Sequence, residues 1–147
     1  MSFIKSNIDF TDCILTLDNL EKKLNISINR TKKLVLIFSL TVCQPCKQLT
    51  NSIDEIYNDK NIDKSLLPLI IKFNVDDDLL NDDDIKYIKK YPTIFIFDQN
   101  DMINYNDEES LIDSCYQNSI SNNNQKGTII VGNLNKFLDQ TNLSIDF

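Results

Sequence analysis

The chain has 147 residues, of which 41% are hydrophobic and 25% charged, a composition typical of a globular domain. Its formal net charge of -7 provides no basic surface for nucleic acid or an anionic membrane. The chain has no histidine and only two glycines, which excludes a Ser-His-Asp triad, a histidine-ligated metal site and a glycine-rich phosphate loop. Four cysteines remain as the residues best suited to chemistry.

The N-terminal segment carries no recognisable targeting signal. Residues 1–19 contain several acids and no sustained apolar stretch, so we expect no signal peptide. The longest apolar runs, at 34–38 and 66–71, are too short to cross a bilayer. We therefore expect a cytoplasmic protein without a membrane partner, in which cysteines serve catalysis or metal binding more often than structural disulfides.

The pattern of apolar residues predicts one domain over residues 1–147, in which strands and helices alternate. In chain order, the predicted elements are a strand at 13–17, a helix at 18–28, a strand at 34–40, a helix from Cys46 to Tyr57, a strand at 69–75, a helix at 82–90, strands at 93–97 and 127–131, and a helix around Leu134, Phe137 and Leu138. This order favours an α/β fold whose sheet is covered on both faces.

The last strand of the sheet has two possible positions, because a polar insertion occupies residues 104–126. Either residues 102–105 form a tight hairpin with the strand at 93–97, or residues 127–131 pair with that strand after an excursion containing a short helix near 107–119. We favour the second position because its residues are β-branched from Thr128 onward and a glycine follows them.

The sequence Cys43-Gln44-Pro45-Cys46 lies where a buried strand leads into an amphipathic helix. Cys43 is expected at the helix start, where free backbone N–H groups and the positive end of the helix dipole stabilise a thiolate. Pro45 suits the first turn, where its missing N–H has no consequence. Cys46 falls one turn later on the apolar face and is expected to be shielded. The spacing predicts an attacking thiol and a resolving thiol, as thiol–disulfide exchange requires.

A second motif, Tyr91-Pro92, directly precedes the strand at 93–97. Proline is permitted at the first position of a strand, and X–Pro bonds can be cis. If this loop lies beside the cysteines, a cis Pro92 would leave the backbone of Tyr91 free to pair with an extended substrate segment. Gln44, Pro45, Tyr91 and Pro92 are therefore the predicted substrate-binding residues.

The chain resembles the thioredoxin family in three segments, LVLIFSLTVCQPCKQLTNSIDEI, LIIKFNVDDD and KKYPTIFIF, and more weakly in VGNLNKFLDQ. The resemblance implies a thioredoxin fold, with a central mixed sheet of about five strands flanked by helices on both faces. It implies that Cys43 is the nucleophile, Cys46 the resolving thiol and Pro92 the cis-proline. It further implies a monomer with no bound cofactor other than a redox-active Cys43–Cys46 disulfide. Its partners would be disulfide-containing client proteins, with thioredoxin reductase or glutathione as electron donor.

Several positions depart from the family pattern. Val42 stands where the family usually has tryptophan, and Gln44 where it has glycine. Ile37 replaces a buried aspartate that in the family accepts the proton of the resolving thiol, so we expect Cys46 to resolve mixed disulfides slowly. Lys72 matches a family lysine beneath the site. Without a counter-charge at position 37, Lys72 should turn to solvent or have a lowered pKa.

The remaining cysteines and the acid clusters have simpler explanations. Cys13 and Cys115 lie in apolar patterns and are expected to pack as small hydrophobic residues. A zinc site is disfavoured because it needs four ligands and these two are isolated thiols. The acids at 76–78 and 82–84 fail the calcium-loop template, since Leu80 stands where an oxygen ligand belongs. We expect no metal site.

These observations predict a thiol–disulfide oxidoreductase that reduces protein disulfides through Cys43 and Cys46. The alternative is a thioredoxin-fold adaptor, in which the groove beside Pro92 and the polar insertion hold a partner. The cysteine pair would then be weakly active or redox-sensing. Ile37 and Val42 favour this alternative, since they change the surroundings of the two sulfurs and leave the sulfurs themselves in place.

Overall fold

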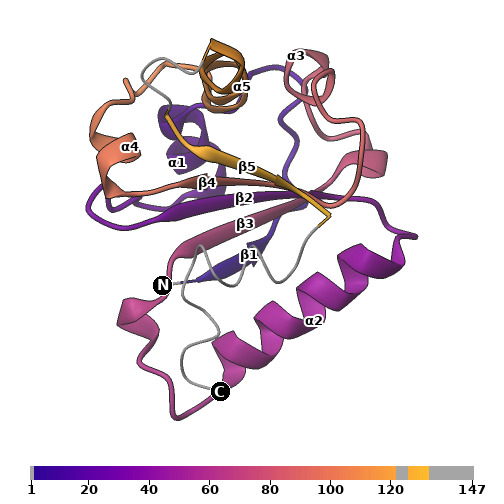
Figure 1. Ribbon diagram of the computed structural model, residues 1–147, viewed down its shortest axis with the longest axis vertical. Helices are drawn as coiled ribbons and strands as arrows, with labels where there is room; N and C mark the ends of the chain where they lie inside the picture. Colours follow the sequence, from indigo (N-terminus) through magenta and orange to yellow (C-terminus); the bar gives the residue numbers. More distant parts are fainter. Residues whose placement is uncertain (1, 122–125, 133–147) are drawn as a thin grey trace.

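The structure is a computed structural model that describes residues 2–121 and 126–132, and a five-stranded sheet forms the centre of this part of the chain (Figure 1). The strands are β1 (Phe3–Lys5), β2 (Leu34–Ser39), β3 (Leu69–Asn74), β4 (Thr93–Phe97) and β5 (Thr128–Val131). Their order in the sheet is β1-β3-β2-β4-β5. Strand β3 is parallel to β1 and β2, whereas β4 is antiparallel to β2 and β5. The sheet is therefore mixed, with β2 in its middle.

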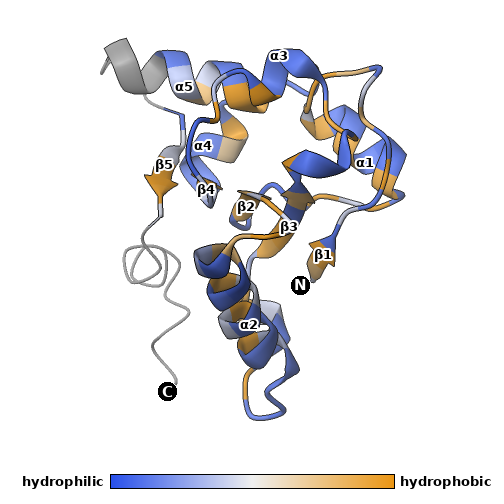
Figure 2. Cartoon of the chain, turned by 90° about the vertical axis from the view of Figure 1, so that its right-hand side faces the viewer, coloured by the Kyte–Doolittle hydropathy of each residue, from blue (hydrophilic) through white to orange (hydrophobic). Residues whose placement is uncertain are grey.

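Helices cover both faces of this sheet. They are α1 (Leu17–Leu24), α2 (Gln44–Asn58), α3 (Asp82–Ile85), α4 (Gln99–Ile103) and α5 (Leu111–Ser121), with short 3-10 turns at Lys64–Leu66 and Val75–Asp77. Figure 2 shows α2 on one side of the strands and the other four helices on the opposite side. The predicted α/β architecture with helices on both faces is confirmed.

Strand β2 is buried completely, because both of its faces are covered. Leu34, Leu36 and Phe38 belong to the apolar cluster that includes residues of α1 and α5. Val35 and Ile37 belong to the cluster that includes the apolar stripe of α2. The unbroken apolar run that predicted this strand thus reflects a strand without a solvent-facing side.

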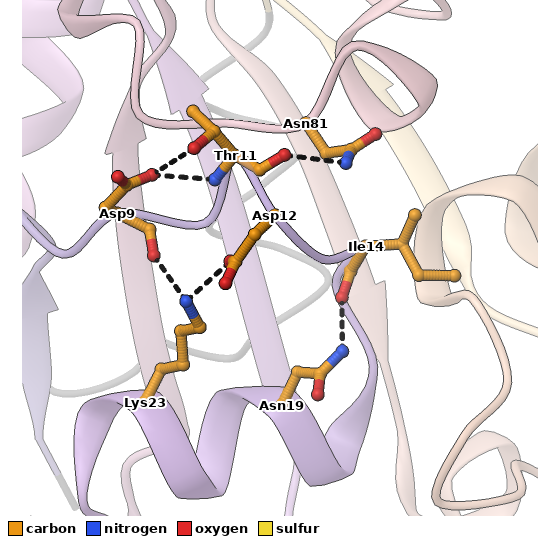
Figure 3. A network of polar contacts seen from close by, with 7 residues as sticks. All are labelled: Asp9, Thr11, Asp12, Ile14, Asn19, Lys23 and Asn81. Carbon is orange, nitrogen blue, oxygen red and sulfur yellow. Dashed lines mark hydrogen bonds and ion pairs between the residues drawn. The ribbon is translucent and has the colours of Figure 1, made fainter.

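The prediction of a strand at residues 13–17 is wrong, because this segment is a loop that leads into α1. Side chains form hydrogen bonds with backbone groups that would otherwise pair with a neighbouring strand. The N–H of Leu15 donates to the carboxylate of Asp84 at 2.9 Å. The side-chain amide of Asn19 donates to the carbonyl of Ile14 at 2.8 Å (Figure 3). These contacts hold the segment in a non-strand conformation.

A network of polar contacts fixes the same loop between α1 and α3 (Figure 3). The Asp9 carboxylate accepts hydrogen bonds from the N–H and the hydroxyl of Thr11. Lys23 pairs with the Asp12 carboxylate at 2.6 Å and donates to the carbonyl of Asp9 at 2.9 Å. Asn81, which caps α3, donates to the carbonyl of Thr11 at 3.0 Å. The loop is therefore anchored to both helices.

Other elements differ from the predicted ones, most clearly β1 and the ends of α1 and α3. Strand β1 has no periodic pattern of its own, since it comprises three residues, and it was not predicted. Helix α1 ends at Leu24 instead of residue 28, because Asn25 adopts the left-handed conformation (φ 54°) that closes a helix. Helix α3 ends at Ile85, earlier than the predicted residue 90.

Strand β5 pairs with β4, so the favoured position of the last strand is confirmed. Residues 102–105 instead form the end of α4 and the turn after it. The polar insertion at 104–126 contains α5, whose buried Leu111 packs in the same cluster as α1. The predicted terminal helix around Leu134 lies outside the described residues.

Asp84 in α3 is an acid buried in this fold, with 1% exposure. Burial raises the pKa of its carboxyl to about 6. The hydrogen bond from Leu15 and the charge of Lys86 lower this pKa, whereas the charges of Asp83 and Asp113 raise it further. Because the folded pKa lies above the unfolded one, ionisation of Asp84 favours the unfolded chain.

Asp84→Asn is expected to make the protein more stable above pH 7, since asparagine keeps an oxygen for the Leu15 N–H and carries no charge. With a pKa of 3.8 unfolded and about 6 folded, ionisation of this carboxyl lowers the stability of the wild-type protein by about 3 kcal/mol as pH rises from 4 through 6. Urea unfolding between pH 4 and pH 8 measures this loss, with Asp82→Asn as the exposed control in the same helix. An Asp84→Asn variant less stable than wild type at pH 8 would contradict the assignment.

Candidate active site

The cysteine pair lies at the first turn of α2, just after the loop that follows β2. Cys43 is the N-cap residue, with an extended backbone (φ -146°, ψ 111°), and Gln44 and Pro45 begin the helix. The Cys43 sulfur accepts a hydrogen bond from the N–H of Cys46 at 3.3 Å, in the position that a capping oxygen usually takes. The helix start therefore favours negative charge on this sulfur when the pair is reduced.

The two cysteines form a disulfide, with 5.2 Å between their Cα atoms, and they differ in exposure. Cys46 is 2% exposed and lies on the buried stripe of α2 with Leu49. Cys43 is half-buried, and the intervening Gln44 and Pro45 are exposed. An opened disulfide therefore presents the Cys43 sulfur outward and keeps the Cys46 sulfur behind it.

The loop before β4 lies beside Cys43. The Tyr91–Pro92 peptide bond is cis, and the Tyr91 carbonyl oxygen is 3.9 Å from the Cys43 sulfur. Pro92 is buried, and its carbonyl accepts a hydrogen bond from the N–H of Gly132 at 2.9 Å. The structure thus brings Cys43, Cys46, Tyr91 and Pro92 together at one edge of the sheet.

Three residues of this neighbourhood were missed by the sequence analysis. The Asp76 carboxylate accepts the Thr41 N–H at 3.1 Å and the Thr41 hydroxyl at 3.0 Å, and it thereby holds the loop before Cys43. These residues are 35 positions apart, so no local pattern indicates the contact. Gly132 could have been identified from the sequence, since it directly follows a β-branched run. Its positive φ of 63° suits glycine.

Burial raises the pKa of the Tyr91 hydroxyl, and the nearby charge of Asp76 raises it further. Tyr91 therefore stays neutral at pH 7. The rim of the site combines this neutral phenol, the Asp76 carboxylate and the exposed side chain of Val42, which is 86% accessible. Val42 thus offers an apolar contact next to Cys43, where the family usually has tryptophan.

Ile37 and Lys72 are direct neighbours in the pairing of β2 with β3. Ile37 is 1% exposed and packs with the apolar stripe of α2. Lys72 is half-buried, and burial followed by the charge of Lys5 lowers the pKa of its ammonium group. Asp54 and Asp77 partly oppose this shift. Position 37 supplies no counter-charge to Lys72.

The two remaining cysteines lie away from this pair and are free. Burial raises the pKa of Cys115 to about 12, and burial also raises the pKa of the half-buried Cys13. Both therefore remain neutral thiols at pH 7, as expected for packing residues.

Within residues 2–121 and 126–132, no group of three or more His, Cys, Asp or Glu side chains could hold a metal ion.

A mixed sheet that carries a cysteine pair at a helix start, with a cis-proline loop beside it, places the chain among the thioredoxin-fold dithiol proteins. The family model Thioredoxin matches residues 14–130. The chain therefore belongs to the thioredoxin family, whose members perform thiol–disulfide exchange on disulfide-containing substrates.

One of the solved structures to which the chain is similar supports this fold. The thioredoxin pre-protein of Schistosoma mansoni, solved in its reduced form, superposes with a TM-score of 0.54 at 19% sequence identity, covering 96% of this chain and 97% of that chain. The germline-specific thioredoxin Deadhead of Drosophila melanogaster gives a TM-score of 0.49 at 14% identity, covering 95% of each chain. The search of curated proteins found no match.

Within the part of the chain that the structure describes, no helix is both long enough and apolar enough to span a bilayer.

Asp76→Ala is expected to lower the free energy of unfolding by about 0.5 to 1 kcal/mol, because the exposed Thr41 N–H and hydroxyl exchange a charged acceptor for water. Asp77→Ala removes the same charge from an exposed neighbour and should change stability by less than about 0.5 kcal/mol. Urea unfolding of both variants measures the difference. Equal losses in the two variants would show that the Thr41–Asp76 contact does not stabilise the loop.

Proposed function

We propose that the protein is a disulfide reductase that acts on client proteins by dithiol–disulfide exchange. The observation that carries this proposal is the difference in solvent exposure between the two cysteines. Cys43 caps α2 at the surface, and Cys46 is 2% exposed directly behind it. An exchange reaction needs one sulfur that a client can reach and a second that reaches only the first. The Tyr91 carbonyl, 3.9 Å from the Cys43 sulfur, supports the same reading, since main-chain groups there can pair with an extended client segment.

The proposed reaction starts from the reduced pair. The Cys43 thiolate attacks one sulfur of a client disulfide, that S–S bond breaks, and the first client sulfur leaves as a thiolate. Deprotonated Cys46 then attacks the Cys43 sulfur and displaces the second client sulfur. The Cys43–Cys46 disulfide forms as two electrons pass to the client, whose thiolates take protons from solvent.

Turnover requires an external two-electron donor, because each cycle leaves the Cys43–Cys46 pair oxidised. An NADPH-dependent thioredoxin reductase or glutathione is the proposed donor, and the proposed acting form is a cytoplasmic monomer. The redox potential of the pair decides the direction of net transfer.

Cys43→Ser is expected to abolish reduction of insulin disulfides with dithiothreitol as donor, because the attacking sulfur is lost. Cys46→Ser should retain the first attack and accumulate covalent mixed disulfides with clients. Insulin turbidity measures the first effect, and non-reducing electrophoresis measures the second. Cys13→Ser is the matched control and should keep wild-type activity. A wild-type protein without insulin reduction would overturn the enzymatic proposal.

A second candidate function is a thioredoxin-fold adaptor, in which the surface around Cys43 and Tyr91 binds a partner without exchange. Two observations favour it: Val42 is 86% exposed beside Cys43, and Ile37 leaves no acid in the layer beneath α2. The adaptor needs no activated thiol. The acidity of Cys43 therefore separates the two candidates.

The pKa of Cys43 in the reduced protein is expected to lie at least about one unit below the usual 8.5 of a free cysteine, because the helix start stabilises the thiolate. The pH dependence of iodoacetamide alkylation, followed by mass spectrometry, measures this pKa. Cys13 in the Cys43→Ser variant serves as reference, since burial raises its pKa. An unshifted Cys43 would favour the adaptor.

A further inference from the structure

Asp76 contacts one of the two loops beside the Cys43 sulfur and lies near the other. Its carboxylate accepts the N–H of Thr41 at 3.1 Å and the hydroxyl of Thr41 at 3.0 Å, two residues before Cys43. In the other loop, the Tyr91 carbonyl oxygen is 3.9 Å from the Cys43 sulfur. Burial raises the pKa of the Tyr91 hydroxyl, and the charge of Asp76 raises it further. The carboxylate therefore acts on both loops.

Strand pairing places this acid at the edge of the sheet where the chain leaves toward Cys43. Strands β2 and β3 are parallel, and Ser39 at the end of β2 is paired with Asn74 at the end of β3. Thr41 and Asp76 each follow two residues later, Asp76 in the 3-10 turn after β3. The position of Asp76 beside the site thus follows from the register of the two strands.

The Asp76 carboxylate keeps capacity for a further hydrogen-bond donor. Its Oδ1 atom accepts both the N–H and the hydroxyl of Thr41. Within the described residues, its Oδ2 atom accepts only the shared N–H, at 3.1 Å. Each carboxylate oxygen has about two acceptor sites, and Asp76 is exposed. A donor on a bound client can therefore reach Oδ2.

Lysines also lie near the pair, but they do not neutralise Asp76. Lys47 follows Cys46 in α2, and Lys89 and Lys90 precede Tyr91, and all three are exposed. None of them forms a salt bridge with Asp76 in the part of the chain that the structure describes. The negative charge of Asp76 is thus available to a client.

We propose that Asp76 selects client proteins in which a lysine or arginine lies beside the disulfide. This inference rests on the proposed reductase function and names its class of clients. A client that places its disulfide on the Cys43 sulfur lies against Tyr91 and the loop of Thr41, so its neighbouring side chains come close to Asp76. A cationic side chain there gains a charge-assisted hydrogen bond to Oδ2. An acidic side chain is repelled by the same group.

The selection acts on the first exchange step, because the charges meet while the client disulfide approaches the Cys43 sulfur. Two unit charges about 7 Å apart in water change a rate constant about threefold. A client with a cationic neighbour and one with an anionic neighbour differ by two charges, so Asp76 should separate their rates by about tenfold. The formal net charge of -7 adds a preference of the same sign at longer range, which every exposed acid shares.

Three small disulfides of different charge measure this selection. Cystamine is cationic, dithiodipropionate is anionic, and hydroxyethyl disulfide is neutral. The reduced protein reacts with each of them in a Cys13→Ser background, and alkylation followed by mass spectrometry gives the rate at which the Cys43–Cys46 disulfide forms. Rates relative to the neutral disulfide cancel any change in the reactivity of Cys43 itself.

Three variants separate the charge of Asp76 from its contact with Thr41. Asp76→Asn removes the charge and keeps an oxygen for the Thr41 N–H and hydroxyl. Asp76→Glu keeps the charge. Glu55→Gln is the matched control for loss of one negative charge, because Glu55 is exposed and lies about 18 Å along α2 from Cys43.

In Asp76→Asn, the ratio of the cystamine rate to the dithiodipropionate rate is expected to fall about tenfold below that of the wild type at about 0.1 M salt. Asp76→Glu and Glu55→Gln should stay within about twofold of the wild-type ratio, and about 1 M salt should remove the effect of Asp76→Asn.

A wild-type ratio in Asp76→Asn, or an equal fall in Glu55→Gln, would overturn the selection by Asp76 and leave the proposed function intact. A ratio in Asp76→Glu as low as in Asp76→Asn would overturn the role of charge. A wild-type protein that reacts with none of the three disulfides would overturn the proposed function itself.

Discussion

The burial of β2 on both faces is the constraint on which the rest of the structure depends. Because every residue of β2 is buried, the chain has to supply two separate apolar layers, and side chains alternate between them. Val35 and Ile37 pack against the stripe of α2, whereas Leu34, Leu36 and Phe38 pack on the side of α1 and α5. With β3 and β4 on its two edges, β2 cannot shift by one residue without moving every side chain into the wrong layer.

This fixed register places the candidate site. Strands β2 and β4 are antiparallel, with Phe38 opposite Thr93, so the end of β2 and the start of β4 lie at the same edge of the sheet. The chain leaves that edge toward Cys43 and returns to it through Pro92. Strand β5 is antiparallel to β4 and ends where β4 begins, which brings Gly132 to the Pro92 carbonyl. The sulfur and the cis peptide bond therefore meet because of strand pairing, and no strong contact between them is needed.

Sequence reasoning was accurate where the deciding signal is local. Apolar runs located β2, β3 and β4, and the CxxC spacing with its proline located the start of α2. Prediction failed where the deciding contact joins distant residues. The hydrogen bond from Leu15 to Asp84 spans 69 positions and makes residues 13–17 a loop, and the bond from Thr41 to Asp76 spans 35. Strand β1 has too few residues to show a pattern and is defined by its pairing with β3.

The replacement of a family acid by Ile37 has two opposing physical effects. It makes the layer beneath α2 continuously apolar, since Ile37, Val35 and Ile94 are all at most 1% exposed. It also removes the free-energy cost of burying a carboxylate. It also leaves Lys72, its partner in the register, without an acid at that position. The core gains apolar packing and loses the carboxylate that could take up a proton beneath α2. The substitution thus removes a proton acceptor from the layer behind the second sulfur, while the position of both sulfurs still follows from the burial of β2.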